Sequence, residues 1–350
     1  MNLRLKFFIL LHLLFVLSVS AQNGRIFSSD SELSSSLINA IYQDHKGYIW
    51  IATEDGLNKY DGAKFVTYKK NAQDSTSLLN NYVKSIFEDD KNNLYFGFFN
   101  GLQIYDHATD SFKQIPLSIN EEYTYDAHVT NITQRKTGEI LIGTSGRGVF
   151  RLQKNGDDFL AENLPEFLPT AFVDHIYQDS KHNLWFITPE TGLFLVNQKN
   201  EITPFFQEGN TRASLSAIGE DEAGNIYAAS YTQGLFKFNS NDSVFESIPN
   251  TKHLVIHSLF LNSENEMLVG TDGDGLFRFD PSTQTLSPYP IMVSSFDSSK
   301  SKVHDIVEDD SGNTWLGLYQ KGVVLLPKKI NNFNYIGYES SELDIIGSNC

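Results

Sequence analysis

Cysteine is almost absent from this sequence of 350 residues, because its single copy is Cys350, the last residue. One thiol cannot close an intramolecular disulfide, so no covalent cross-link within the chain is available to hold the fold together. Hydrophobic residues make up 40% of the chain and aromatic residues 13%. We therefore expect the stability of the fold to come from the packing of apolar side chains.

Basic residues are scarce relative to acidic ones. Lys and Arg together number 27 against 43 Asp and Glu, which gives a formal net charge of −16. Proteins that bind nucleic acids neutralise phosphates with clustered Lys and Arg. An acidic surface instead repels phosphate backbones and anionic lipid headgroups, so the composition argues against a nucleic-acid partner.

Long hydrophobic runs are missing except at the start of the chain. Residues 7–19 form an apolar run of about 13 residues, which is shorter than the roughly 20 that span a bilayer. Arg4 and Lys6 precede the run, and the small residues Val19 and Ala21 end it. This arrangement is typical of a signal peptide. We predict a signal peptide over residues 1–21, cleavage after Ala21, a periplasmic location and no membrane insertion after cleavage; an uncleaved anchor is the alternative.

What the sequence does contain is an internal repeat. Its seven anchor positions are Ile41, Ile86, Ile132, Ile176, Ile218, Leu259 and Ile306. Neighbouring anchors are between 41 residues (Ile218 to Leu259) and 47 residues (Leu259 to Ile306) apart. Such a period, with several short β-branched and aromatic runs in each unit, is typical of a propeller rather than a helical repeat. We predict an all-β fold, a seven-bladed β-propeller of four-stranded antiparallel blades, over residues 22–330.

Each unit is expected to form its four strands around turns rich in Asp and Gly. After the first strand comes a turn such as residues 44–47, where Asp caps the turn and Gly accepts a positive φ. The second strand carries a large residue that should face the next blade. These large residues are Trp50, Tyr95, Leu141, Trp185, Tyr227, Leu268 and Trp315. A glycine then precedes the third strand in every unit, and the fourth strand is a short aromatic segment.

The two ends of the repeat region predict how the ring closes. Residues 25–28 precede unit one and should pair with the third strand of unit seven, near residues 323–326. Residues 331–350 would then be a linker or the opening strand of a second propeller. In the alternative arrangement, residues 333–336 complete unit seven themselves.

The first unit carries a family resemblance. It reads Ile-x-x-Asp-x-x-Gly-x-Ile-Trp-Ile-x-Thr-x-x-Gly-Leu-x-x-Tyr-Asp from Ile41 to Asp61, and this resembles the two-component regulator propeller repeat of periplasmic sensors in Bacteroidetes hybrid two-component histidine kinases. Unit three departs from the pattern in its turn at residues 134–136, and unit two has Asn92 in place of the turn glycine. The resemblance implies a sensory propeller for polysaccharide-derived ligands. It also implies that this chain corresponds to the first propeller only, without the kinase part.

Ligand-binding candidates are the positions that differ between units. The position two residues before each anchor is polar in every unit, although the residue before it is always Ile, Val or Leu. We name this set the polar column: Asn39, Lys84, Thr130, Asp174, Ser216, His257 and His304. It should surround the central channel, either as a ligand site or simply as the wall of a water-filled channel.

Variable loops should lie near the same face of the propeller. The connections between units are long, at residues 69–81, 116–127, 160–171 and 291–301. The loops before the glycine that precedes the third strand of each unit contribute further candidates: Phe99, Arg147, Tyr231 and Tyr319. Aromatic rings stack on sugar rings while polar groups fix hydroxyls, so an oligosaccharide is the expected ligand, and a second propeller or other receptor domain is the expected partner.

Catalytic and metal motifs fail on their context, so we expect no catalytic site, no metal and no cofactor. The glycine-rich residues 143–148 lie between two strands, where no helix follows to hold a phosphate. Residues 272–275 have too few ligands for a calcium loop. His253 and His257 have no evident third ligand, and His45 and His182 occupy turns that should be solvated. A protein-binding scaffold, and a lyase or hydrolase using His257, His304 and Lys84, are the alternatives.

Overall fold

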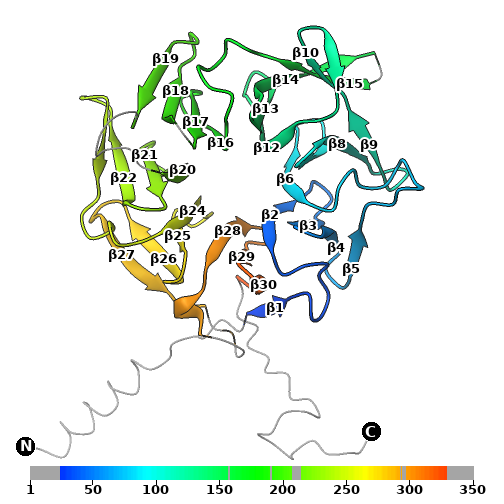
Figure 1. Cartoon of the computed structure of the whole chain (residues 1–350). Coiled ribbons are helices and arrows are strands. Elements are labelled where there is room, and N and C mark those ends of the chain that lie inside the picture. Colours follow the sequence, from blue (N-terminus) through cyan, green and yellow to red (C-terminus); the bar gives the residue numbers. More distant parts are fainter. Residues whose placement is uncertain are drawn as a thin grey trace, which may run out of the picture.

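The computed structural model describes residues 24–328, apart from residues 157, 190, 207–213, 292 and 294–296. The predicted signal peptide and the segment 331–350 lie outside the described residues. Seven antiparallel sheets stand around a central axis like the blades of a wheel (Figure 1). The prediction of a seven-bladed, all-β propeller is therefore confirmed. None of the helices among the described residues is long and apolar enough to cross a membrane.

Each blade runs from an innermost strand at the axis to an outermost strand at the rim. The innermost strands are β2 (Ile38–Gln43), β6 (Val83–Glu88), β12 (His128–Gln134), β16 (His175–Gln178), β20 (Leu215–Glu220), β24 (Ile256–Leu261) and β28 (Val303–Glu308). The second strands are β3 (Ile49–Thr53), β7 (Leu94–Phe98), β13 (Ile140–Ser145), β17 (Leu184–Thr188), β21 (Ile226–Ser230), β25 (Met267–Thr271) and β29 (Thr314–Leu318).

The two outer positions complete the blades. The third strands are β4 (Gly56–Tyr60), β8 (Gly101–Asp106), β14 (Gly148–Asn155), β18 (Gly192–Val196), β22 (Gly234–Asn239), β26 (Leu276–Asp280) and β30 (Gly322–Leu326). The fourth strands are β5 (Phe65–Tyr68), β9 (Ser111–Ile115), β15 (Asp158–Asn163), β19 (Ile202–Phe205), β23 (Val244–Ser247), β27 (Thr285–Tyr289) and, in blade seven, β1 (Arg25–Phe27). One 3₁₀ turn, η2 (Ser298–Lys300), precedes β28.

Blade three is larger than expected. The segment 116–127, expected to be a loop, contains the hairpin β10 (Leu117–Ile119) and β11 (Glu122–Thr124), and β10 pairs in parallel with β15. The hairpin extends this sheet to six strands. The start of the expected loop 160–171 is also strand, because β15 continues to Asn163. Among the described residues, no other blade has a counterpart of this added hairpin.

The ring closes as the sequence predicted. Strand β1 pairs antiparallel with β30, with Arg25 opposite Leu325 and Phe27 opposite Val323. Phe27 is fully buried, and its ring stacks on Trp315 at a centroid distance of 5.9 Å. The first described strand of the chain thus completes the last blade. The alternative closing segment, residues 333–336, lies outside the described residues.

The hydrophobic core is divided among the blade interfaces. Trp50 of β3 is fully buried and packs against Phe96 and Tyr105 of blade two, with ring centroids 5.3 and 5.0 Å away. Trp185 contacts Phe238 of blade five in the same way. The prediction that these large residues face the next blade is confirmed. Each blade therefore buries its apolar face against its neighbour, as stacked repeats do.

Aspartates in the first turn of the blade fix these large residues by a repeated set of contacts. The Oδ1 of Asp44 accepts hydrogen bonds from the backbone N–H of Lys46 and of Tyr48, and its Oδ2 accepts one from Trp50 Nε1 at 2.7 Å. We name this set the aspartate lock. It recurs in the pairs Asp89–Tyr95, Asp179–Trp185, Asp221–Tyr227 and Asp309–Trp315. The Asp44 carboxylate is buried. A buried carboxylate needs hydrogen-bond donors, and these contacts supply them.

A second repeated contact joins each blade to the next. The side chain of the last residue of an innermost strand accepts a hydrogen bond from a backbone N–H in the first turn of the preceding blade. We name it the junction hydrogen bond, and the acceptors are Gln43, Glu88, Gln134, Gln178, Glu220 and Glu308. The equivalent residue between blades five and six is Leu261, whose side chain cannot accept one.

Glycine before the third strand is required by close backbone contact. Gly234 has φ of +74°, and a Cβ at this position would lie 2.2 Å from the carbonyl oxygen of Thr251. Only glycine fits such a position without displacing the neighbouring chain. Thr251 belongs to the connection between blades five and six, so this connection lies directly against the start of the third strand of blade five.

Candidate functional site

A polar cavity lies at the centre of the ring, at the end where the second and third strands are joined. We call this end the channel mouth, and the opposite end, with the first turns of the blades, the turn face. The cavity has a volume of about 550 Å³, within the roughly 300–1,000 Å³ of small-molecule sites. All seven residues of the polar column line it: Asn39, Lys84, Thr130, Asp174, Ser216, His257 and His304.

The polar column faces the channel because of a repeated irregularity in the innermost strands. In six blades the pairing between the first and second strands shifts by one residue at this position, for example between Ile38 and Ala40 and between Val83 and Ser85. A β-bulge leaves the extra residue unpaired and redirects its side chain. The buried Ile38 or Val83 can then face the core while the next residue faces the channel. This explains why apolar and polar residues are adjacent there.

Some residues of the polar column have structural partners. Asn39 Nδ2 donates to the carbonyl oxygen of Val83 at 2.8 Å, and Thr130 Oγ1 contacts the carbonyl oxygens of Gly143 and Val173. In contrast, Lys84 Nζ forms no hydrogen bond or ion pair with any described residue, and Ser216 Oγ is buried without a partner among them. Lys84 and Ser216, together with His304, whose Nε2 is also buried without a hydrogen bond to a described residue, therefore have polar groups that remain available to a ligand.

Four rings form a continuous stack on one side of the cavity. His257 and His304 lie nearly parallel, with centroids 3.8 Å apart and an interplanar angle of 12°. Tyr231 packs edge-on against His257 at 4.7 Å, and Tyr319 lies 5.1 Å from His304. Burial, together with the neighbouring His304, lowers the pKa of His257 to about 4, and burial also lowers the pKa of His304. Both imidazoles are therefore neutral at neutral pH and can stack closely.

An ion pair beside this stack was not anticipated from the sequence. Lys302 Nζ lies 2.8 Å from Asp272 Oδ1, and His304 Nε2 lies 3.9 Å from the same oxygen. Asp272 belongs to the segment 272–275, which has too few ligands for a calcium loop. It is brought to the channel mouth by the loop of blade six, whereas Lys302 and His304 come from blade seven. The pairing joins different repeats, so a comparison of repeats could not reveal it.

Three further residues of the cavity wall have altered acidity. Burial raises the pKa of Asp305 to about 6, although its carboxylate accepts hydrogen bonds from the backbone N–H of Ile41, at 2.7 Å, and of Ile306. Burial also lowers the pKa of His175 to about 4. Desolvation raises the pKa of Asp174, and the positive charge of Lys84 counteracts part of this rise. The three pKa shifts cannot be predicted from residue type, because burial is the main cause of each.

The structure places three of the four loop candidates in the cavity or beside residues that line it, but not the fourth. Tyr231 lines the cavity, and Tyr319 contacts His304. Phe99 is 58% exposed, and its ring lies 4.7 Å from that of His128, which lines the cavity. Arg147 instead lines a separate hollow in blade three, where its carbonyl oxygen accepts a hydrogen bond from Asn163.

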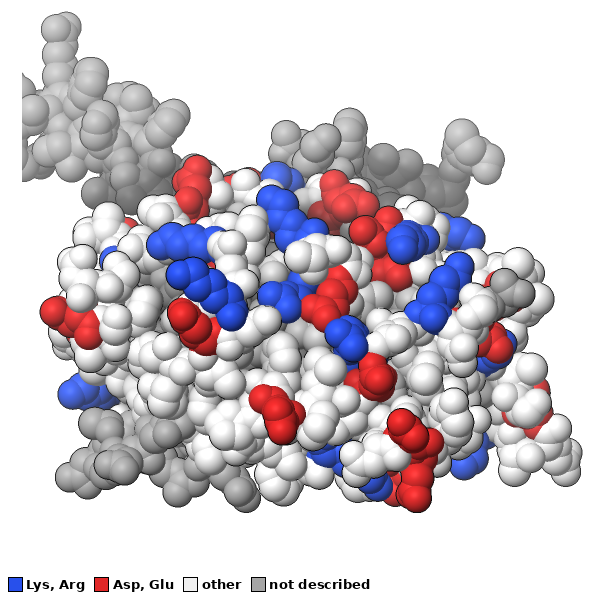
Figure 2. All heavy atoms as spheres, turned by 90° about the horizontal axis from the view of Figure 1, so that it is seen from above, with Lys and Arg blue, Asp and Glu red and all other residues white. Residues whose placement is uncertain are grey.

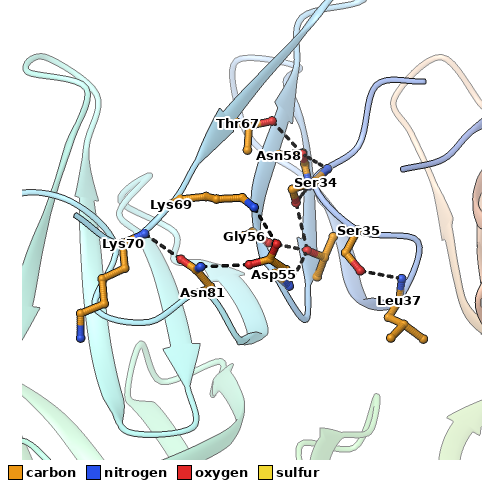
Figure 3. Close-up of polar contacts among 11 residues, drawn as sticks. Ser34, Ser35, Leu37, Asp55, Gly56, Asn58, Thr67, Lys69, Lys70 and Asn81 are labelled. Atoms are coloured by element: carbon orange, nitrogen blue, oxygen red, sulfur yellow. Dashed lines mark hydrogen bonds and ion pairs between the residues drawn. The ribbon is translucent and has the colours of Figure 1, made fainter. Parts of the chain in front are cut away.

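The loops of blade one show how the channel mouth is held in place. Asp55 forms an ion pair with Lys69 at 2.6 Å and accepts a hydrogen bond from Asn81 Nδ2 at 2.9 Å (Figure 3). The hydrogen bond from Lys69 lowers the pKa of Asp55. Asn81 Oδ1 in turn accepts from the backbone N–H of Lys70. The two ends of the connection 69–81 are therefore tied to the neighbouring loop.

On the side of the ring that Figure 2 shows, basic and acidic side chains are intermixed, and neither kind forms a patch of one charge. Ion pairs on blade three explain part of this pattern. Arg151 contacts both Glu139 and Glu162, and Arg135 contacts Glu139. Since ion pairs at a protein surface are worth little in free energy, we regard them as surface contacts rather than as a binding site.

Comparison with known proteins agrees with this architecture. The channel and the stacked repeats define a seven-bladed β-propeller. The two-component regulator propeller family matches residues 32–55 and 77–100. These are the first parts of blades one and two, so the chain carries two-component regulator propeller repeats and the resemblance is confirmed. Over 76 residues, 21% of this chain and 6% of the relative, it is 40% identical to histidine kinase P4 of Formosa agariphila.

Solved structures share the fold. The extracellular domain of a putative hybrid two-component system from B. thetaiotaomicron has a TM-score of 0.73 at 23% identity, over 87% of this chain and 42% of that one. PorZ of Porphyromonas gingivalis, described as a component of the type-IX secretion system, has a TM-score of 0.65 at 15% identity, over 86% and 47%. Virginiamycin B lyase from Staphylococcus aureus has a TM-score of 0.64 at 14% identity, over 87% and 98%. This chain thus spans less than half of the two-component structure and a small part of the kinase.

Proposed function

We propose that this chain is an exported ligand-recognition propeller of a two-component sensor, and that the ligand binds at the channel mouth. The observation that carries the proposal is the cavity itself. Seven polar side chains of six types converge there from seven equivalent positions of the repeat, although the residue before each of them is a similar apolar one. Loops on a rigid scaffold are the usual place for recognition. The regulator propeller repeats support a sensory role.

We further propose an oligosaccharide as the ligand. Tyr231, Tyr319 and Phe99 are each more than one third exposed, and they stand around the cavity on three different blades. Aromatic faces of this kind suit the apolar faces of sugar rings, and the ammonium of Lys84 and the hydroxyl of Ser216 suit the sugar hydroxyls. The ends of the loop in blade one are tied down, which lowers the conformational cost of binding.

The test is calorimetric titration of the purified chain with defined glycan fragments. Replacing Tyr319 or Lys84 by Ala should weaken binding by about 5- to 150-fold, because a lost stacking ring or hydrogen bond at a desolvated contact is worth about 1–3 kcal/mol. Lys91→Ala, an exposed lysine of the turn face, is the matched control and should bind as the parent does. Absence of heat with every fragment tested, for this chain and for a full-length relative, would count against a glycan ligand.

A protein partner is the second candidate, and one observation favours it. The added hairpin of blade three exposes Tyr123 and Tyr125, which are 68% and 51% accessible. Exposed tyrosines are common in protein interfaces, and a second propeller or receptor domain could use them. If that role is the true one, Tyr123→Ala should abolish capture of the partner domain while glycans give no heat with any variant.

Catalysis is the third alternative. His257 and His304 are neutral and adjacent, and Lys84 lines the same cavity. Acid–base chemistry would require one of them to act on a bound substrate. Turnover of a polysaccharide that is lost in His257→Ala would establish it, and we expect none.

A further inference from the structure

A second group of side chains gathers at the turn face, far from the channel mouth. His45 comes from the first turn of blade one, Glu88 from the end of β6 in blade two, and His107 from the turn between β8 and β9 of blade two. One ligand atom of each lies within 4.8 Å of the other two. The sequence indicated a solvated turn for His45. The residue is exposed, as expected, and its Nδ1 lies 2.5 Å from Glu88 Oε1, with its side chain 30% exposed.

The group has features that ordinary turn packing does not require. The Glu88 side chain is only 7% exposed, so this carboxylate is held in a largely dry position. Its second oxygen accepts the junction hydrogen bond from the backbone N–H of His45. His107 Nε2 is buried and has no hydrogen-bond partner among the described residues. A buried, unpartnered imidazole nitrogen beside a buried carboxylate is a polar group that lacks its ligand.

The geometry of the two imidazoles distinguishes this group from the histidines of the channel mouth. Since zinc binds an imidazole nitrogen at about 2.0–2.1 Å, each ring centroid lies about 3.2 Å from the ion, and two rings at a tetrahedral angle have centroids about 5.2 Å apart. The centroids of His45 and His107 are 5.1 Å apart, with an interplanar angle of 84°. Those of His257 and His304 are 3.8 Å apart and nearly parallel, which would force an angle of about 70° at one ion.

We propose that His45, Glu88 and His107 form a Zn²⁺ site that joins blades one and two at the turn face. Two imidazoles and one carboxylate are a common zinc ligand set that leaves a fourth position for water. The ion takes the place of the proton between His45 Nδ1 and Glu88 Oε1, and the imidazole proton is then carried on His45 Nε2. These two atoms lie 2.5 Å apart without the ion and must separate to about 3.3 Å to hold zinc at about 2.0 Å each. His107 supplies the third ligand through its free nitrogen. Nearby Lys46 and Lys59 oppose the positive charge, so we expect micromolar rather than tighter affinity.

The experiment is titration of the whole chain, prepared without a histidine tag, with ZnCl₂ by calorimetry. Co²⁺ is added in parallel to report tetrahedral coordination by its visible absorption. We expect one Zn²⁺ per chain and a melting temperature that rises with zinc concentration, because binding to the folded state stabilises it. Glu88→Gln and His107→Gln should each weaken binding by more than the roughly 10–100-fold that loss of an outer partner costs.

Glu88→Gln is a suitable variant because glutamine occupies the equivalent position in blades one, three and four, as Gln43, Gln134 and Gln178. The junction hydrogen bond should therefore survive, and the melting temperature in chelator should be close to that of the parent. His253→Gln, at an exposed turn, and His257→Gln, at the channel mouth, should bind zinc as the parent does. The proposal is overturned if the parent binds no Zn²⁺ at millimolar concentration, if His107→Gln binds normally, or if His257→Gln is the variant that loses binding.

Discussion

The turn face and the channel mouth of this propeller follow opposite rules. At the turn face the aspartate lock recurs in five blades and the junction hydrogen bond at six junctions, with nearly the same distances each time. At the channel mouth the equivalent residues differ in charge, size and hydrogen-bonding capacity. Repetition therefore marks the contacts that hold the ring together, and variation marks the positions that are free to serve recognition.

The exceptions at the turn face support this interpretation. In blades three and six the second strand carries Leu141 and Leu268, which have no polar hydrogen to donate, and the turn carries Arg135 and Asn262 in place of aspartate. Asn262 still accepts from the backbone N–H of Glu266 at 2.8 Å. The buried carboxylate is thus present only where a Trp or Tyr can satisfy it, because an unpaired buried charge is costly.

The largest effect should come from breaking an aspartate lock. Asp44→Ala removes a buried acceptor and leaves Trp50 Nε1 buried without a partner, so we expect a loss of about 3 kcal/mol in the free energy of unfolding. Urea denaturation measures it. Asp61→Ala is the control, because Asp61 also caps a turn but is exposed, and it should cost about 1 kcal/mol or less. Equal losses for the two variants would contradict the distinction.

An intermediate effect should come from Asp305, a residue of the cavity wall that nevertheless serves the ring by accepting from Ile41 of blade one. Its folded pKa of about 6 lies above the ordinary 3.8, so the folded protein holds this proton more tightly than the unfolded chain does. The resulting stability is present at low pH and is lost as pH rises through 6. Asp305→Asn should therefore gain about 2 kcal/mol relative to the parent between pH 4.5 and pH 7.5.

Denaturation curves at the two pH values test this second prediction. An unchanged difference between parent and variant would show that the carboxyl titrates normally. The result also sharpens the comparison of the two faces, since it separates channel residues that support the ring from those that remain available to a ligand.

The smallest effect should come from one junction hydrogen bond. Gln43 Oε1 accepts from the backbone N–H of Asp310 at 2.6 Å, between blades seven and one. Gln43→Leu copies the residue that blade six carries naturally, and we expect a loss of about 1 kcal/mol in urea denaturation. Ligand binding at the channel mouth should not change. A weakened ligand affinity in this variant would mean that the two faces are coupled.

Most of the fold could be predicted from the sequence because each blade repeats the same signals. The anchor residues, the turn aspartates and the glycines before the third strands set the blade count, and the spare segment 25–28 indicated how the ring closes. The hairpin β10–β11 could not be predicted because the repeat carries no signal for it: residues 117–124 occupy a place where the other units were expected to have loops.

The candidate site could be predicted only in part from the sequence, for a related reason. The polar column was visible because its residues occupy one equivalent position. The partners of those residues were not visible: Asp272 meets His304 across two blades, and His45 meets Glu88 and His107 across two others. Comparing repeats aligns residues that are equivalent, whereas these contacts join residues at different positions of the repeat. Arg147 shows the opposite failure, since a loop position shared with Tyr231 does not bring it to the cavity.

The pairing of β1 with β30 has a mechanical consequence. Arg25, at the beginning of β1, lies opposite Leu325, next to the last residue of β30. The chain therefore enters and leaves this ladder at the same end. A tension that drew the entering and leaving segments apart would load the hydrogen bonds of the ladder one after another, as in opening a zip, rather than all at once. The seam of blade seven is thus the place where the wheel would yield first to a pull.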